Sequence, residues 1–234
     1  MSWQIVNGDA RHISLTDESV QCVPTSPPYW GLRDYGLAPS VWGGREDCEH
    51  EWGEPETGRV TGGGNRPPDN KWRNVERTGD KAGPRFTCGK CGAWLGVLGL
   101  EPTPELYVAH MIEIFHEIWR VLRKDGTVFL NLGDSYASSG GAHGGRDDNQ
   151  PGVGAARAHD AGAGDQARRV SPPGLKPKDL CGIPWRVALA LQADGWWLRS
   201  DIIWSKPNPM PESMADRPTR AHEYIFLLTK SERY

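Results

Sequence analysis

A turn of two prolines between a serine and two aromatic residues is the first place where this sequence could do chemistry. Residues 26–30 read Ser-Pro-Pro-Tyr-Trp and follow an alternating stretch, residues 19–24, that predicts a strand. Prolines donate no backbone hydrogen bond and restrict the chain around them. Ser26 and the Pro27 carbonyl could each accept one N–H of a planar NH2 group while an aromatic ring stacks on its plane. A plain proline-rich turn packed by aromatic rings is the alternative interpretation.

Three of the five cysteines lie in one stretch that otherwise has few core residues. Cys88 and Cys91 form a C-x-x-C-G turn that resembles a zinc knuckle, and Cys48 and His50 precede it. These four side chains predict a tetrahedral site for Zn²⁺ inside a zinc-knuckle-like insert, residues 42–99. The metal would be structural, because four protein ligands leave no open position for a substrate. Reduced thiols without a metal, in a loop, are the alternative.

Two segments are candidates for contact with DNA. The insert carries aromatic and basic side chains, although a solvated charged loop would have the same composition. Residues 137–180 form the second candidate, a target-recognition loop whose basic residues could reach phosphates but are nearly balanced by aspartates. Residues 140–164 hold 8 Gly and 6 Ala, which predicts a flexible loop. The side chains concerned are Trp42, Trp52, Trp72, Arg45, Arg59, Arg66, Lys71, Arg73 and Arg77 in the insert, and Arg157, Arg168, Arg169, Lys176 and Lys178 in the loop.

The surrounding pattern predicts an α/β fold. Strands are expected at residues 3–6, 19–24, 127–132, 197–204 and 224–229, and helices at 104–122 and 184–191, the first with Thr103 as its N-cap. Alternating strands and helices are typical of a parallel sheet, and the two consecutive strands at the end predict an antiparallel hairpin at one edge. Ligands of such sheets bind at the carboxyl ends of strands, where the double-proline turn lies.

Composition excludes several classes of protein. The 234 residues carry a formal net charge of −3 and 37% hydrophobic residues, which argues against a generic polyanion binder and against wholesale disorder. Neither a membrane-length apolar run nor a signal peptide is evident, and an odd cysteine count argues against a disulfide framework. We therefore expect a cytoplasmic protein without membrane contact, with Cys22 and Cys181 buried as small hydrophobic residues.

Several segments, in order, resemble the amino-DNA methyltransferases, the N4-cytosine/N6-adenine family. The turn followed by Gly-Leu-Arg-Asp-Tyr-Gly resembles motif IV of that family, and Asn-Gly-Asp-Ala at residues 7–10 resembles the segment before it. Residues 118–134, 195–211 and 221–229 resemble the helix-to-strand segment and the last strand pair. Motif IV near the start resembles the permuted β-type order. The resemblance implies a class I (Rossmann-like) methyltransferase fold, formed by a single catalytic domain over residues 1–234, with S-adenosylmethionine as cofactor and double-stranded DNA as partner.

The resemblance also implies roles for individual residues. Ser26, Pro27, Pro28 and Tyr29 would form the catalytic turn, in which hydrogen bonds from a flipped base localise the lone pair of its amine for attack on the sulfonium methyl. Serine, where aspartate is the common alternative in the family, favours cytosine N4 over adenine N6. Asp9 and Thr25 would contact the cofactor, and the alternative for Asp9 is that it forms a turn after Gly8. Asn131 and Asp134 could line the pocket or form a turn. His110 and His116 are expected to be structural.

One family feature is missing. The glycine-rich strand–turn–helix that binds the methyl donor is expected after the last strand pair, and the 234 residues contain no substitute for it. The fold is therefore expected to be incomplete at its donor-binding half, as in a truncated or split methyltransferase that is inactive alone unless a second polypeptide supplies that half. Two other functions compete with DNA methylation. One is methylation of another amine, in RNA or on a protein glutamine. The other is a non-catalytic, zinc-containing DNA-binding remnant.

Overall fold

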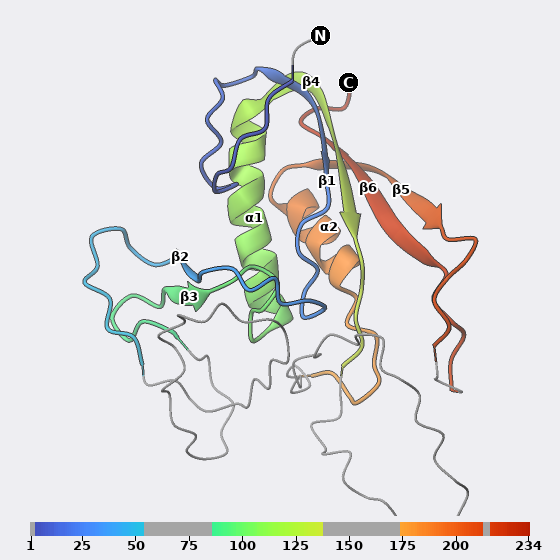
Figure 1. The fold of residues 1–234 in the computed structure, drawn as a ribbon. Coiled ribbons are helices and arrows are strands. Elements are labelled where there is room, and N and C mark those ends of the chain that lie inside the picture. Colours follow the sequence, from blue (N-terminus) through green and yellow to red (C-terminus); the bar gives the residue numbers. More distant parts are fainter. Residues whose placement is uncertain (1–2, 54–85, 138–173, 213–215) are drawn as a thin grey trace, which may run out of the picture.

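The computed structural model describes residues 3–53, 86–137, 174–212 and 216–234, which form a mixed sheet with two helices (Figure 1). The sheet has the order β1-β4-β6-β5, formed by β1 (Val20–Thr25), β4 (Leu122–Leu132), β6 (His222–Thr229) and β5 (Trp197–Ser205). β1 and β4 are parallel, whereas the β4–β6 and β6–β5 pairs are antiparallel. The predicted α/β class and the antiparallel edge hairpin are confirmed, but only one of the strand pairs in the described part of the chain, β1 with β4, is parallel.

The two helices begin where the sequence provides N-terminal partners for their backbone. Helix α1 (Pro104–Val121) begins after Thr103, whose side chain accepts the Leu106 N–H at 3.2 Å, as expected for an N-cap. Helix α2 (Ile183–Ala193) begins after Gly182, which has no side chain to cap it. A residue distant in the sequence caps it instead, because the Asp134 carboxylate accepts hydrogen bonds from the N–H groups of Gly182 and Ile183, each at 3.0 Å.

The core lies between the helices and alternate residues of β4 and β6. Val128, Leu130 and Leu132 of β4 are completely buried with Phe226 and Leu228 of β6. Both helices bury apolar side chains in the same cluster. This packing fixes the carboxyl ends of β1 and β4, where the turn at residues 26–30 and Asn131 lie. The helix contribution to the cluster is Tyr107, Met111, Ile114, Phe115 and Ile118 of α1 and Ile183, Val187, Ala188 and Leu191 of α2.

A small two-stranded sheet lies beside the first turns of α1 (Figure 1). We call it the hairpin, although a long insert separates its two strands. It is formed by β2 (Ser40–Trp42) and β3 (Trp94–Gly96), which pair antiparallel with Trp42 opposite Trp94. The sequence did not predict this hairpin, because each strand is only three residues long. Most of the insert between its strands, and most of the loop predicted at 137–180, lie outside the described residues.

Three expectations at the sequence level are wrong in detail. Residues 3–6 form no strand, and Trp3 is 84% exposed, because no described strand lies beside them to pair with. The strand expected at 127–132 is longer than predicted, because β4 already begins at Leu122 directly after the helix and includes residues 123–126, which the prediction left between the two elements. Cys22 is exposed, on a part of β1 that no described element covers, whereas Cys181 is buried as expected. In the part of the chain that the structure describes, no helix has the length and apolar character needed to cross a membrane.

Candidate active site

The double-proline turn follows directly from β1 and places the Tyr29 hydroxyl at the centre of a polar cluster. Ser26 donates its hydroxyl proton to the Tyr29 oxygen at 3.3 Å. The Tyr29 hydroxyl in turn lies 2.9 Å from Asn131 Oδ1 and 3.0 Å from Glu223 Oε2. Glu223 also forms an ion pair with Lys206. The turn after β1 thus contributes Ser26 and Tyr29, β4 contributes Asn131 and β6 contributes Glu223 to one polar cluster.

The ionisation of this cluster is set by burial and charge. Burial raises the pKa of Tyr29 to about 12, and the neighbouring Glu223 carboxylate adds to the shift. Burial also pushes the pKa of Glu223 upward, but hydrogen bonds from Lys206 and Tyr29 outweigh it and leave that pKa below its ordinary value. At neutral pH the cluster therefore contains a neutral phenol beside an ionised carboxylate.

The backbone of the turn is fixed from α1 and from the segment after β3. The buried Tyr107 hydroxyl donates to the Pro28 carbonyl at 2.9 Å. The indole N–H of Trp30 donates to the Glu101 carbonyl at 2.9 Å, and the Gly31 N–H donates to the Gly99 carbonyl. The Tyr29 ring lies so close to β4 that a Cβ at Gly133 would stand 2.6 Å from it, which explains why position 133 carries no side chain.

A cavity of about 260 Å³ lies behind the turn. Thr25, Pro27 and Pro28 line one wall, and Met111 and Phe115 of α1 line another. Ala10, the residue after Asp9, also lines the cavity. Of the two predicted cofactor residues, Thr25 therefore lines the cavity and Asp9 is the chain neighbour of a lining residue. The turn therefore faces a cleft and is not filled by the protein's own core.

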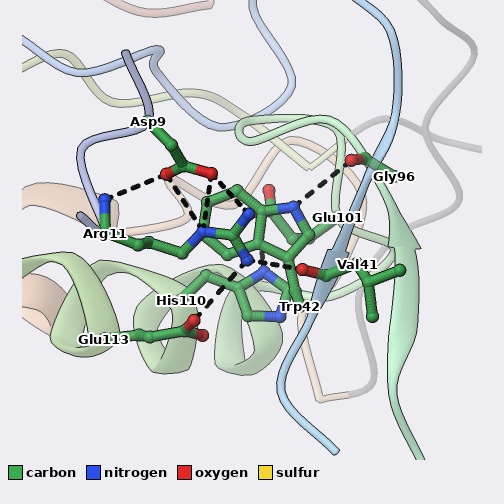
Figure 2. Close-up of polar contacts among 8 residues, drawn as sticks. All are labelled: Asp9, Arg11, Val41, Trp42, Gly96, Glu101, His110 and Glu113. Carbon is green, nitrogen blue, oxygen red and sulfur yellow. Dashed lines mark hydrogen bonds and ion pairs between the residues drawn. The ribbon is translucent and has the colours of Figure 1, made fainter. Parts of the chain in front are cut away.

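Asp9 is held by its neighbour Arg11 (Figure 2). The Asp9 carboxylate accepts from the Arg11 guanidinium at 2.6 and 3.1 Å, and this hydrogen bonding keeps the pKa of Asp9 below its ordinary value. The Arg11 guanidinium lies 4.1 Å from the centroid of the Trp42 ring and also donates to the Val41 carbonyl. The Asp9 side chain remains 41% exposed, so it keeps free acceptor capacity.

Below Trp42 lies a buried acid–imidazole pair. The His110 ring stacks on Trp42 at 4.8 Å and on Trp94 at 5.3 Å between ring centroids. Its Nδ1 lies 3.0 Å from Glu101 Oε1, and Glu101 Oε2 accepts the Gly99 N–H at 2.8 Å. His110 is therefore structural, as the sequence predicted, and Figure 2 shows it between the hairpin and α1.

The four predicted metal ligands come together. Ligand atoms of Cys48, His50, Cys88 and Cys91 all lie within 4.8 Å of one another, although two of these residues precede most of the insert and two follow it. The remaining sequence candidates separate into two roles. Asn131 contacts Tyr29, whereas Asp134 is the cap of α2 and burial raises its pKa.

The sequence reasoning missed Glu223, Glu101 and Arg11. Glu223 had a signal, since a charged residue at the start of an otherwise apolar strand needs a partner when it is partly buried. Glu101 and Arg11 had none, because their contacts with His110 and Trp42 join residues of different elements.

Comparison with known proteins connects this site with a family. The model of the DNA methylase family N6_N4_Mtase matches residues 20–234. The chain is 38% identical over 235 residues to the Type II methyltransferase M.SmaI of Serratia marcescens, and 39% identical over 232 residues to M.XycI of Xanthomonas campestris pv. cyanopsidis. These matches cover 100% and 98% of this chain but only 58% and 55% of the relatives, so the chain spans little more than half their length.

A solved structure, the cytosine-N4-specific PvuII DNA methyltransferase, aligns with 97% of this chain and 48% of its own, with 14% identity and a TM-score of 0.46. The family match covers most of the chain and includes the turn, both helices and all four strands of the main sheet. It confirms the family resemblance stated from the sequence, and with it the predicted class of fold. The chain belongs to the N6/N4 DNA methylase family.

Proposed function

We propose that this chain is the base-binding part of a DNA methyltransferase that methylates the exocyclic amine of a flipped base, cytosine N4 rather than adenine N6, in double-stranded DNA. Family membership and the names of the relatives, which are Type II methyltransferases, support the reaction class and a restriction–modification setting. The observation that carries the proposal is the direction of the hydrogen bonds that leave Ser26.

The hydroxyl of Ser26 has one proton, and that proton is already used. It is donated to the Tyr29 oxygen, while the Tyr29 proton faces the acceptor oxygens of Asn131 and Glu223. The exposed Ser26 oxygen is thereby left as an acceptor. The Pro27 carbonyl oxygen is a second acceptor at the same turn. The turn therefore presents two acceptors, which is what an NH2 group with two donor hydrogens requires.

An amine conjugated with a base ring is a weak nucleophile because its lone pair is delocalised. Two acceptors, Ser26 Oγ and the Pro27 carbonyl, would draw both amine hydrogens out of the ring plane and localise that lone pair. The base must first leave the stack, which costs roughly a few kcal/mol, and the half-buried Tyr29 ring would then hold it. S-adenosylmethionine, when bound, supplies the methyl group on a positively charged sulfur. No covalent link to the protein is needed.

The described residues fit only part of the methyl donor. The mainly apolar cavity beside the turn would take a flat ring, and Asp9, still partly exposed, would accept a ribose hydroxyl. Among the described residues, none forms a glycine-rich strand–turn–helix for the methionine end. Since the matched relatives are nearly twice as long, we propose that residues outside these 234, on the same or a second polypeptide, hold that end.

The proposal includes a structural Zn²⁺ at Cys48, His50, Cys88 and Cys91. The convergence of their four ligand atoms supports it. The ion takes no part in methyl transfer, because a site filled by four protein ligands has no position left for substrate.

Transfer of a labelled methyl group tests the proposal. The chain is incubated with labelled S-adenosylmethionine and duplex DNA, alone and together with the part of the M.SmaI-type relative that it does not cover. Nucleoside analysis then separates N4-methylcytosine from N6-methyladenine. We expect N4-methylcytosine, abolished by Ser26→Ala and retained by Ser40→Ala, a serine of β2 outside the turn.

Three outcomes would contradict the proposal in different ways. DNA binding without any methyl incorporation in either mixture favours a non-catalytic DNA-binding remnant. Incorporation into RNA or protein, but not into DNA, would mean that the turn binds an amine of another substrate. N6-methyladenine as the product retains the reaction and overturns the choice of base.

A further inference from the structure

The cluster of three cysteines and one histidine lies next to the hairpin, which is connected to Asp9 through Arg11 and to the base-binding turn through Gly99 and Glu101, the segment after β3. We propose that Cys48, His50, Cys88 and Cys91, with Zn²⁺ bound, act as a clamp that holds the β2–β3 hairpin, and that this hairpin fixes the position of residues 26–31. The first step depends only on the cluster. The second step, that the fixed segment is a base-binding turn, rests on the proposed function.

The spacing of the ligand atoms matches a tetrahedral zinc ion. Zinc–sulfur and zinc–nitrogen bonds of about 2.3 and 2.0 Å place ligand atoms of a tetrahedron roughly 3.8 Å apart for two sulfurs and about 3.5 Å apart for sulfur and nitrogen. Cys48 Sγ lies 4.0 Å from Cys88 Sγ, and Cys91 Sγ lies 3.4 Å from His50 Nδ1. A disulfide requires sulfurs about 2 Å apart, and Cys48, Cys88 and Cys91 are all free thiols.

The backbone around the cluster is arranged for thiolates. Backbone N–H groups of Arg45 and Ala93 lower the pKa of the Cys91 thiol, and those of Lys90 and Cys91 act in the same direction on Cys88. Such N–H donors outside the ligand set orient the ligands and offset their negative charge. Gly44 allows the close approach, because it has a φ of +78° and a Cβ there would lie 2.9 Å from Cys91 Sγ.

The hairpin needs such a clamp because its own interactions are few. Two strands of three residues cannot be stable alone. The ligands hold the chain on either side of them, since Cys48 and His50 follow β2 whereas Cys88 and Cys91 precede β3. Binding of the metal would therefore contribute directly to folding of the hairpin.

Two lines of contact lead away from the clamped hairpin. On one side, the Trp42 ring of the hairpin contacts the Arg11 guanidinium, and the guanidinium in turn binds the Asp9 carboxylate (Figure 2). Through the segment after β3 it reaches the turn, since the Gly99 carbonyl accepts the Gly31 N–H and the Glu101 carbonyl accepts the Trp30 indole N–H. Glu101 itself is fixed by His110, on which both tryptophans of the hairpin stack.

Metal binding is measured first, on the full chain. Native mass spectrometry of reduced protein should show one zinc for the wild type and for Cys22→Ser, the matched control with an exposed cysteine elsewhere. Cys91→Ser should weaken zinc binding by more than about a hundredfold, and Cys91→His, which restores a ligand, should recover much of it. Since Cys91→Ser can fail to fold, Co²⁺ is added to the wild type as a second measurement, and the visible spectrum of a tetrahedral thiolate complex is expected. Wild type that takes up neither metal overturns the clamp.

Hydrogen exchange then tests what the clamp holds, without DNA or methyl donor. Zinc removal by a chelator should speed exchange at the Gly31 amide and the Trp30 indole at least about tenfold, and should leave amides of β6 such as Phe226 unchanged. Exchange at residues 30–31 that does not respond to zinc overturns the positioning step even when zinc binds. Because neither measurement involves methyl transfer, failure of the clamp and failure of the proposed reaction are told apart.

Discussion

The hydroxyl of Tyr29 lies 3.0 Å from a carboxylate oxygen of Glu223, although 194 residues separate the two in the chain. One residue belongs to the turn after β1 and the other to β6, and β4 lies between these strands in the sheet. The contact closes a path from Lys206 through Glu223 and Tyr29 to Ser26. The direction of each hydrogen bond in this path follows from the ionised carboxylate at Glu223.

Replacement of Glu223 is expected to slow methyl transfer without removing any group of the turn. A hydrogen bond to a charged group is worth about 1.5–3 kcal/mol, so Glu223→Ala should lower the rate about tenfold to a hundredfold. Glu223→Gln keeps an acceptor for Tyr29 and should lose less. The rates are measured by methyl incorporation under single-turnover conditions. Glu232→Gln, a change of an exposed glutamate after β6, is the control, and equal rates for it and Glu223→Ala would contradict the role.

Tyr29 should remain protonated at a pH where ordinary tyrosines have ionised. Its pKa of about 12 predicts that Tyr29→Phe leaves the absorbance titration between roughly pH 8 and 11 unchanged. Folding favours the neutral phenol, so the stabilisation is complete below the ordinary pKa and is lost as the pH rises through about 12. A titration of the variant with one tyrosine fewer below pH 11 would show that Tyr29 is not buried in this way.

The hydroxyl of Tyr107 should contribute measurably to the free energy of unfolding, because it donates a hydrogen bond to the backbone of the turn. Tyr107→Phe leaves the Pro28 carbonyl without its donor in a buried place, which should lower the free energy of unfolding by about 1–3 kcal/mol. Urea denaturation measures the change, and Tyr234→Phe, at the exposed last residue, should change it by less than about 0.5 kcal/mol. A loss no larger than that of the control would mean that water satisfies the carbonyl.

The Glu101–His110 pair should show strong coupling. His110→Ala removes the partner of a buried carboxyl group and should cost about 3–5 kcal/mol of unfolding free energy. Glu101→Ala alone should cost a comparable amount, because the Gly99 N–H also loses its acceptor. The double variant should therefore cost less than the sum of the two by about 1 kcal/mol or more. Additive losses would show that the two side chains act independently.

Local signals in the sequence predicted the elements that depend on them. Thr103 and Pro104 marked the start of α1, and the apolar stretches before Thr229 and after Gly195 marked β6 and β5. The turn at Ser26 and the four metal ligands were also identified, because their residue types and spacing suffice to suggest their chemistry. Whether the turn residues catalyse and the cluster binds zinc stays a prediction.

Features that depend on distant contacts were beyond the sequence. The strand pairing of β1 with β4, the cap that Asp134 gives to α2 and the partner of Tyr29 each join residues from different elements. Residues 3–6 show the opposite error, since their strand-like pattern has no partner strand among the described residues. Local propensity indicates what a segment can form, whereas pairing requires a neighbour that the pattern does not contain.

Helix α1 sets the spacing between the segments that surround the site. Five of its polar contacts with residues outside the helix come from positions spaced three or four apart: Tyr107 to the turn, His110 to Glu101, Glu113 to Arg11, Glu117 to Ile13 and Arg120 to Leu15. Inserting a single residue near its middle would rotate everything beyond by about 100° and shift it by about 1.5 Å. Substitutions on the outer side of this helix should be tolerated, but its length in residues cannot change without separating the N-terminal segment from the turn.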